Sequence, residues 1–411
     1  MATLVLCSCL LLSQAITSEM IDHARAGAEA QEQGRLDDAV REFRKVTELQ
    51  PASASGHANL GNVYFLKGDY RASIPELEEA LKIKPNLLGT QRTLGVELLV
   101  IGDAAGALPH LEMISAPDLL GVAYYRTGRL GSAIMALQAA LEAKPTDPDL
   151  LYYFGSATAL ASKRTHDQLI RIKPELASQD PSPLAPGSSP SADVVSLQKA
   201  LADKPDDPEL QRAFSRASEL ASQHTFEKLL QSNPGSARAH QVLGERQAAE
   251  GRLREARAEY AAAVRLNPYM PDVHLALGRL FGADGNWPAA IAQYRVECEL
   301  QPENAEPAYR LGSALLETGD AAGALEQFAA ADKLRPGQPR ILLALGQAAF
   351  AAKDSTRAEA AWTMLIRIGK DSEEVATAHE RLAALYRQQG RVKEAEHESA
   401  AYEQMKNQGG R

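Results

Sequence analysis

The chain of 411 residues is long enough for two or three ordinary domains or for one long array of repeats. Its hydrophobic fraction of 45% is typical of globular proteins and excludes wholesale disorder. With 44 Lys and Arg against 53 Asp and Glu, the net charge is −9, and no basic stripe offsets it, so nucleic acid is excluded as an expected partner.

Residues 1–15 have the pattern of a secretory signal peptide. The apolar run Leu4–Leu12 is followed by Ser13 and Ala15, which are small residues suited to cleavage after Ala15. The run is too short for a membrane span, which needs about 20 apolar residues. No positive charge precedes it, which leaves open a misassigned start or an intracellular protein with an apolar first helix. We expect export (periplasmic or secreted), with a cytoplasmic location if the leader is not cleaved; the lipoprotein-like box Leu6–Cys9 has too few apolar residues before it to be favoured.

Two columns of glycines recur with steps of 34 residues inside groups, and the register shifts between groups, as in the 26-residue step from Gly95 to Gly121. A repeated glycine inside a helix, at a cost of about 0.5–1 kcal/mol, indicates close helix packing. A glycine seven positions later ends that helix, and a proline ends the next one. The first column consists of Gly27, Gly61, Gly95, Gly121, Gly155, Gly244, Gly278, Gly312 and Gly346; the second consists of Gly34, Gly68, Gly102, Gly128, Gly251, Gly285, Gly319 and Gly390. Each period therefore predicts a helix, a turn and a second helix.

Residues 56–64 (Gly-His-Ala-Asn-Leu-Gly-Asn-Val-Tyr), followed by Gly-Asp-Tyr at 68–70 and Ile-Lys-Pro at 83–85, resemble the tetratricopeptide-repeat (TPR) motif. The resemblance covers roughly 20–174 and 193–405. It implies an all-α fold, a TPR α-solenoid in which antiparallel helix pairs stack into a right-handed superhelix. It also implies a concave face that receives peptides or protein partners.

The register of the repeats divides the chain into two expected modules. The first, 20–174, contains repeats near 20–53, 54–87, 88–113 and 114–147 and a degenerate one at 148–174. The second, 193–405, contains a degenerate repeat at 193–236 and repeats at 237–270, 271–304, 305–338, 339–375 and 376–405.

Residues 135–174 recur at 195–234 with a constant offset of 60, which we interpret as an internal duplication. Between the copies, the Pro/Ser-rich segment 175–192 is predicted to be a flexible linker. The alternative is a looped-out insertion across which the superhelix continues, because Ala192–Asp203 has the pattern of a second helix without its first.

The sequence contains no recognisable catalytic or metal-binding motif. Five histidines occupy the same place in five first helices, and one repeat of separation is too far for sharing one ion. We interpret these as packing residues: His23, His57, His240, His274 and His379. Phosphate loops, nucleophile elbows and zincin motifs are not found. We therefore expect no enzyme activity, no cofactor and no metal.

The resemblance to the TPR family implies that residues flanking the first glycine column, on the first helix of each repeat, are candidates for a partner-binding groove. In the first module these are Asn62, Phe65, Arg92, Tyr125 and Arg126; in the second they are Arg238, Gln241, Glu245, Arg279, Tyr309, Arg340 and Gln347. The expected function is a non-catalytic scaffold or adaptor of the cell envelope that binds proteins or peptides. The alternative is a structural repeat protein that associates with itself end to end. The last helix carries Glu394, Glu396, Glu398 and Lys406, and this polar surface favours a capped, monomeric array.

Overall fold

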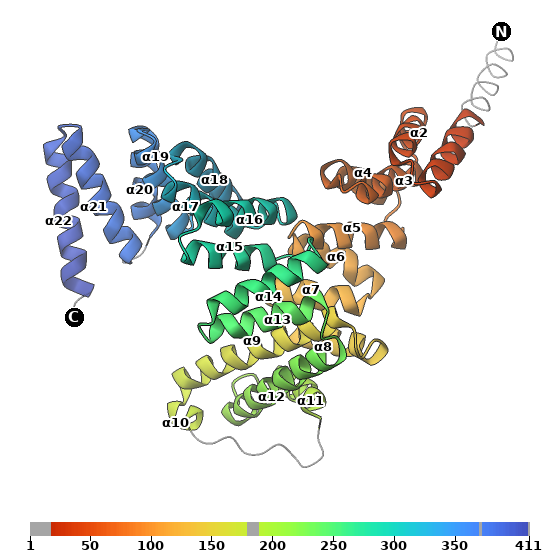
Figure 1. Ribbon diagram of the computed structural model, residues 1–411, viewed down its shortest axis with the longest axis horizontal. Coiled ribbons are helices and arrows are strands. Elements are labelled where there is room, and N and C mark those ends of the chain that lie inside the picture. The colour runs from red at the N-terminus through yellow and green to blue at the C-terminus, as the bar shows by residue number, and fades with distance from the viewer. Residues whose placement is uncertain (1–17, 179–188, 370–371, 410–411) are drawn as a thin grey trace, which may run out of the picture. The chain divides into compact units, whose positions relative to one another are not determined.

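The computed structural model describes residues 18–178, 189–369 and 372–409, and regular structure within these ranges is entirely helical (Figure 1). The expected leader 1–15 and most of the expected linker lie outside them. The chain forms two compact units, Met1–Pro234 and Gly235–Arg411, here called the N-terminal and the C-terminal unit.

The N-terminal unit begins with helical residues at 18–32. Its further helices are α2 (Leu36–Leu49), α3 (Ala54–Leu66), α4 (Tyr70–Ile83), α5 (Leu88–Val100), α6 (Ala104–Ile114), α7 (Pro117–Arg126), α8 (Leu130–Ala143), α9 (Pro148–Ile172), α10 (Pro174–Ala177), α11 (Pro190–Asp203) and α12 (Pro208–Ser232).

The C-terminal unit continues the alternation of first and second helices. They are α13 (Ala237–Ala249), α14 (Leu253–Leu266), α15 (Val273–Ala283), α16 (Trp287–Leu300), α17 (Ala305–Glu317), α18 (Ala321–Leu334), α19 (Pro339–Ala351), α20 (Ser355–Ile368), α21 (Glu373–Gln388) and α22 (Val392–Gly409). The predicted all-α solenoid of helix pairs is thus confirmed.

The turn between the two helices of a repeat is formed by the second-column glycine and the residue after it. Gly68 has φ 74°, a left-handed conformation that costs glycine little and other residues more. The side chain of Asp69 then accepts the backbone N–H of Ala72 and caps the N-terminus of α4. Short connections of this kind make the two helices antiparallel neighbours.

First-column glycines allow the two helices of a repeat to approach closely. A Cβ built on Gly61 would lie 2.6 Å from the Leu77 side chain, and one built on Gly278 would lie 2.5 Å from the Tyr294 ring. These distances are far below van der Waals contact, so only glycine leaves room for the bulky residue opposite. The packing role predicted for this column is confirmed.

Helices α9 and α12 are each 25 residues long and pass without a turn through the place where other repeats bend. They pack extensively against each other, and α8 also contacts α11 (Figure 1). Segment 190–232 therefore belongs to the N-terminal unit, whereas the sequence-based division placed it with the second module. Ala192–Asp203, which the alternative took as a second helix without its first, lies in α11 and packs mainly on α12.

Candidate partner-binding groove

First helices of neighbouring repeats line the inner side of each stack. Helix α3 contacts α5, α17 contacts α19, and α19 contacts α21, each pair more extensively than the second helices of the same repeats. A stack curves towards the side on which its units approach most closely. Exposed residues of the first helices are therefore the ones that a partner lying in the groove would meet.

In the N-terminal unit, three of the predicted groove residues lie on α3 and α5. Asn62 and Phe65 are half-buried on α3, and Arg92 is exposed on α5. The Phe65 ring is 6.1 Å from the ring of Tyr70, measured between centroids. This edge of the groove combines an amide, an aromatic ring and a solvated guanidinium.

The other two predicted residues of this unit, Tyr125 and Arg126, meet side chains of the neighbouring first helix. The Tyr125 ring lies 5.6 Å from the Tyr153 ring of α9 in an edge-on arrangement. Arg126 donates one hydrogen bond to the Leu99 carbonyl at 2.7 Å and another to the Tyr153 hydroxyl at 3.4 Å. The guanidinium is thus held between α5 and α9, which gives this part of the groove a fixed shape.

In the C-terminal unit, three predicted residues form a hydrogen-bonded row along α13. Arg238 donates to the Gln241 side-chain carbonyl at 2.6 Å, and Gln241 donates to the Glu245 carboxylate at 3.0 Å. Arg238 and Gln241 are only 7% and 3% exposed, whereas Glu245 is half-buried. Of the three, Glu245 therefore offers the most surface to a partner.

A cluster on α17 and α19 joins two more of the predicted residues; we call Glu306, Tyr309, Arg310 and Arg340 the arginine–tyrosine cluster. The Arg340 guanidinium lies 4.8 Å above the Tyr309 ring centroid, and that of Arg310 lies 5.8 Å from it. Glu306 accepts hydrogen bonds from Arg310, at 2.8 Å, and from Arg340. Burial acts to raise the pKa of Glu306, but these two arginines outweigh it and lower the pKa.

The cluster lies between further predicted residues of the same inner face. Arg279 is exposed on α15, one repeat earlier, and Gln347 is half-buried on α19. Within the cluster two guanidinium groups face one carboxylate, so a positive charge remains uncompensated by the cluster itself.

Family models for tetratricopeptide repeats match more than half of the chain. A model described as TPR repeat matches 31–68, and models described as tetratricopeptide repeat match 54–87, 119–148, 220–271, 275–339 and 315–382. The chain belongs to the tetratricopeptide-repeat family. As a TPR protein it is, in general terms, a scaffold for protein interactions.

Solved structures with a similar fold include several TPR proteins, while no curated protein matches the chain in sequence. MamA from Desulfovibrio magneticus is 17% identical, with a TM-score of 0.40, over 42% of this chain and 96% of that one. Pseudomonas aeruginosa pilF is 17% identical, with a TM-score of 0.38, over 59% and 90%. Yeast Tom70 is 14% identical, with a TM-score of 0.35, over 95% and 92%.

The five repeated histidines of this TPR chain fasten the first helix of a repeat to the second. In each, Nδ1 lies within hydrogen-bond distance of a side-chain oxygen 19 residues later: His23–Glu42 at 2.7 Å, His57–Glu76 at 2.6 Å, His240–Glu259 at 2.7 Å, His274–Gln293 at 2.8 Å and His379–Glu398 at 2.5 Å. Across 18–178, 189–369 and 372–409, no three potential ligands gather in a way that could hold a metal ion.

Sequence reasoning missed two acids that the TPR packing buries completely, Glu97 on α5 and Glu297 on α16. Glu97 accepts a hydrogen bond from the Ser73 hydroxyl at 2.9 Å, and its other oxygen has no hydrogen-bond partner. Burial raises the pKa of Glu97 to about 7, against the opposing effect of Ser73. A signal was available, because Glu97 is the one charged residue between Leu94 and Ile101.

Glu297 caps the N-terminus of a neighbouring helix. Its two carboxylate oxygens accept the backbone N–H groups of Asp272, at 2.7 Å, and Leu275, at 2.9 Å. Asp272 has φ 72°, so its own side chain does not serve as the cap of α15. Nothing in the 34-residue period predicts this capping.

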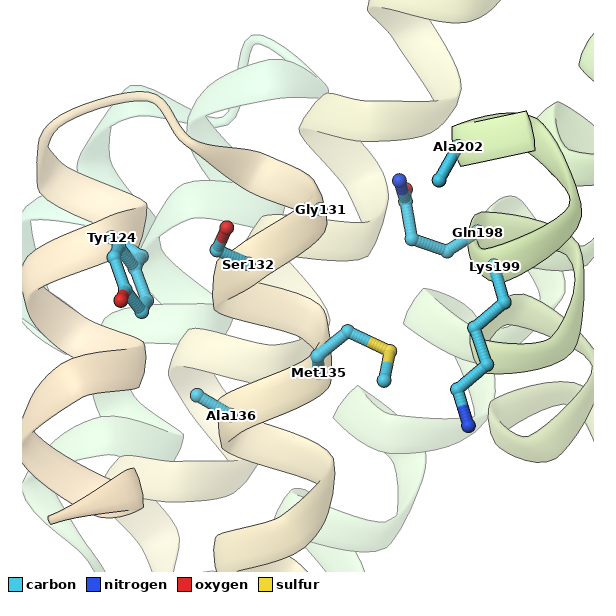
Figure 2. A pocket seen from close by; sticks show the side chains of 8 residues that line it. All are labelled: Tyr124, Gly131, Ser132, Met135, Ala136, Gln198, Lys199 and Ala202. Atoms are coloured by element: carbon cyan, nitrogen blue, oxygen red, sulfur yellow. The ribbon is translucent and has the colours of Figure 1, made fainter. Parts of the chain in front are cut away.

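A pocket of about 510 Å³ opens between α7, α8 and α11 (Figure 2). Met135 of α8 and Gln198 of α11 point into the space between these helices, and a Cβ on Gly131 would lie 2.6 Å from Gln198. It is lined by Tyr124, Gly131, Ser132, Met135, Ala136, Gln198, Lys199 and Ala202. None of the twelve predicted groove residues lines it. Separately, no helix of the described ranges is both long and apolar enough to cross a bilayer.

Proposed function

We propose that this TPR protein is a non-catalytic adaptor that binds a segment of a partner protein in the first-helix groove of its C-terminal unit. The arginine–tyrosine cluster carries the proposal. Tyrosine and arginine are, with tryptophan, the residues most enriched among those that dominate the binding energy of protein interfaces. Here they lie on adjacent first helices, half-buried or exposed, with Arg279 one repeat away.

The chemistry of the cluster favours a partner segment with acidic side chains. Glu306 is shared by Arg310 and Arg340, so each guanidinium keeps donors for a second carboxylate. The face of Tyr309 and the aliphatic stems of the arginines offer apolar surface beside that charge. An acidic segment with one apolar anchor fits both features.

The experiment compares partner capture from the native host by the wild-type chain and two variants. Tyr309→Ala with Arg340→Ala removes the proposed contacts. Arg357→Ala removes an equal charge from α20, a second helix, where the side chain is 69% exposed. A partner captured by wild type and by Arg357→Ala should bind the double variant about 30-fold more weakly, which corresponds to losing about 2 kcal/mol. Equal binding by all three chains, or capture of general chaperones alone, would refute the proposal.

We also propose that the adaptor acts outside the cytoplasm, which rests on the leader-like residues 1–15. Intact mass and N-terminal sequencing of the protein purified from its host test this point. A chain starting at Ile16 is expected. A chain that keeps Met1, or starts at Ala2, would place the protein in the cytoplasm and redirect the search to intracellular partners.

A further inference from the structure

Helix α9 lacks a second helix of its own, and α12 supplies one. In an ordinary repeat the space beside the first-column glycine is filled from the same repeat, as Leu137 fills it beside Gly121. Beside Gly155 of α9, the space is filled by Phe226 of α12, whose ring would lie 2.8 Å from an added Cβ. The last part of α12 thus packs on α9 as a second helix packs on a first.

The two long helices run antiparallel. Asn233, just after α12, donates a hydrogen bond to the carbonyl of Thr146, just before α9, at 2.9 Å. Near the middle, the Ser215 hydroxyl donates to the Ser162 carbonyl at 3.1 Å, and the two hydroxyls are 3.3 Å apart. Small buried residues allow this close crossing: Ala157, Thr158 and Ala161 on α9, with Ala217, Ser218 and Ala221 on α12.

The sequence duplication makes this interface a contact between two copies of one hairpin. An offset of 60 residues carries α8 onto α11 and α9 onto α12, including the bounds of both long helices. Some equivalent residues are buried alike, with Leu169 and Leu229 at 1% and 0% exposure and Ile134 and Val194 both at 0%. The first hairpin is buried more deeply, because Leu130, Ala133, Leu137 and Ala140 of α8 are buried and their counterparts on α11 are half-buried. Antiparallel packing of equivalent segments is the arrangement of an isologous interface, in which a surface pairs with its own copy.

We propose that this interface exchanges between two copies of the chain, so that α11–α12 of one copy packs on α8–α9 of another in a domain-swapped dimer. Every contact between the hairpins is the same within one chain and between two chains, and only the connection between them differs. Exchange of an element under these conditions is a low-cost route to a dimer. The dimer would present two sets of grooves, which raises avidity for a partner with repeated segments. The proposal is independent of the groove residues, so either one can fail without the other.

Disulfide trapping between two full-length chains tests the exchange directly. One chain carries Ser162→Cys and the other Ser215→Cys, both with Cys7→Ser, Cys9→Ser and Cys298→Ala. The chains are mixed, unfolded together, refolded at increasing concentration and oxidised. A covalent heterodimer should form, in a yield that rises with concentration. A control pair replaces Ser215→Cys with Ser196→Cys, which is exposed on α11. A heterodimer yield no higher than in the control pair would overturn the proposal.

A second variant alters only the connection. Helix α11 has 14 residues and is therefore about 20 Å long. Its last residue adjoins the start of α12, which lies near the end of α9. The first residue of α11 therefore lies about 20 Å from the end of α9. Deletion of residues 174–188 joins Lys173 to Ser189, and adjacent Cα atoms are only about 3.8 Å apart. The intrachain pairing then cannot close, and light scattering should show a doubled mass. A chain with a 15-residue Gly/Ser segment in place of 174–188 should stay monomeric at the same concentration. A folded, monomeric deletion chain, judged by circular dichroism and mass, would contradict the exchange. If the deletion chain does not fold, the disulfide result decides.

Discussion

Replacement of Glu97 by glutamine should make the N-terminal unit more stable above neutral pH. The carboxyl group is fully buried between α4 and α5. One of its oxygens accepts a hydrogen bond from the Ser73 hydroxyl, which also lies within hydrogen-bond distance of the Gly61 carbonyl. Burial penalises the ionised form, which has too few donors around it, and raises the pKa from 4.5 to about 7. Glutamine has nearly the same shape and cannot ionise.

The magnitude follows from linkage. In the unfolded chain Glu97 ionises near pH 4.5, while in the folded chain it stays protonated until about pH 7. The stability that it contributes is therefore complete below pH 4.5 and is lost as the pH rises through 7. A difference of about 2.5 pKa units corresponds to about 3 kcal/mol. Wild type and Glu97→Gln should be similar at pH 4.5 and should differ by that amount at pH 8.

Hydrogen exchange measured by mass spectrometry is the appropriate assay, because it reports on α4 and α5 separately from the rest of a long array. Opening free energies of peptides from 70–100, corrected for intrinsic rates, are compared at pH 5 and pH 8. Glu78→Gln, at an exposed position on α4, is the matched control and should change neither value. Faster exchange in Glu97→Gln than in wild type at pH 8 would refute the reasoning, since it would mean that the ionised carboxylate stabilises the fold.

Three further predictions concern other packing features. Gly346→Ala places a methyl group against the Trp362 indole and should cost about 1–3 kcal/mol in urea unfolding followed by tryptophan fluorescence; unchanged stability would contradict this packing. Burial acts to lower the pKa of His57, but hydrogen bonds to Glu76 and to a backbone carbonyl outweigh it and raise the pKa above 6.5. The stability that His57 contributes is therefore present below pH 6.5 and is lost as the pH rises through the raised pKa. Glu76→Gln should lower that pKa in an NMR titration, and an unchanged midpoint would disprove the pairing. Glu297→Gln leaves one of two backbone N–H groups, that of Asp272 or that of Leu275, without an acceptor and should cost about 1–3 kcal/mol. A smaller loss than in a surface Glu→Gln variant would show that the cap is dispensable.

The repeated part of the fold could be predicted because each packing feature is local. A glycine and its bulky partner lie within one repeat, as Gly61 and Leu77 do, and recur with the period. The short third repeat was also predicted. Its second helix, α6, ends at Ile114, where Ser115 adopts φ 49° and Pro117 begins the next helix.

The pairing of α9 with α12 could not be predicted from the same pattern. The sequence shows that both degenerate repeats lack a turn and that one duplicates the other. It does not show that Phe226 fills the space beside Gly155, because these residues are far apart in the chain and follow no period. Division of the array at the proline-rich segment rested on composition, which carries no information on long-range packing.

Prediction of the groove stopped at the first helices and their flanking positions. It included Tyr309 and Arg340, which the structure brings together, but neither Glu306 nor Arg310, which complete the cluster. It also included Arg238 and Gln241, which the structure buries. Within a first helix, exposure depends on the neighbouring repeat, so a single repeat does not determine it.

Site-specific photo-crosslinking tests most directly whether partners bind in the first-helix groove. A photoreactive phenylalanine analogue replaces Tyr309 on α17 in one chain and exposed Ala330 on α18, the second helix of the same repeat, in another. Both chains are irradiated in the native host, and crosslinked products are identified by mass spectrometry. A partner bound in the groove should give a defined crosslinked peptide, rich in acidic residues, at position 309 and not at position 330. Crosslinks to the same partner from position 330, with none from position 309, would contradict binding in the groove.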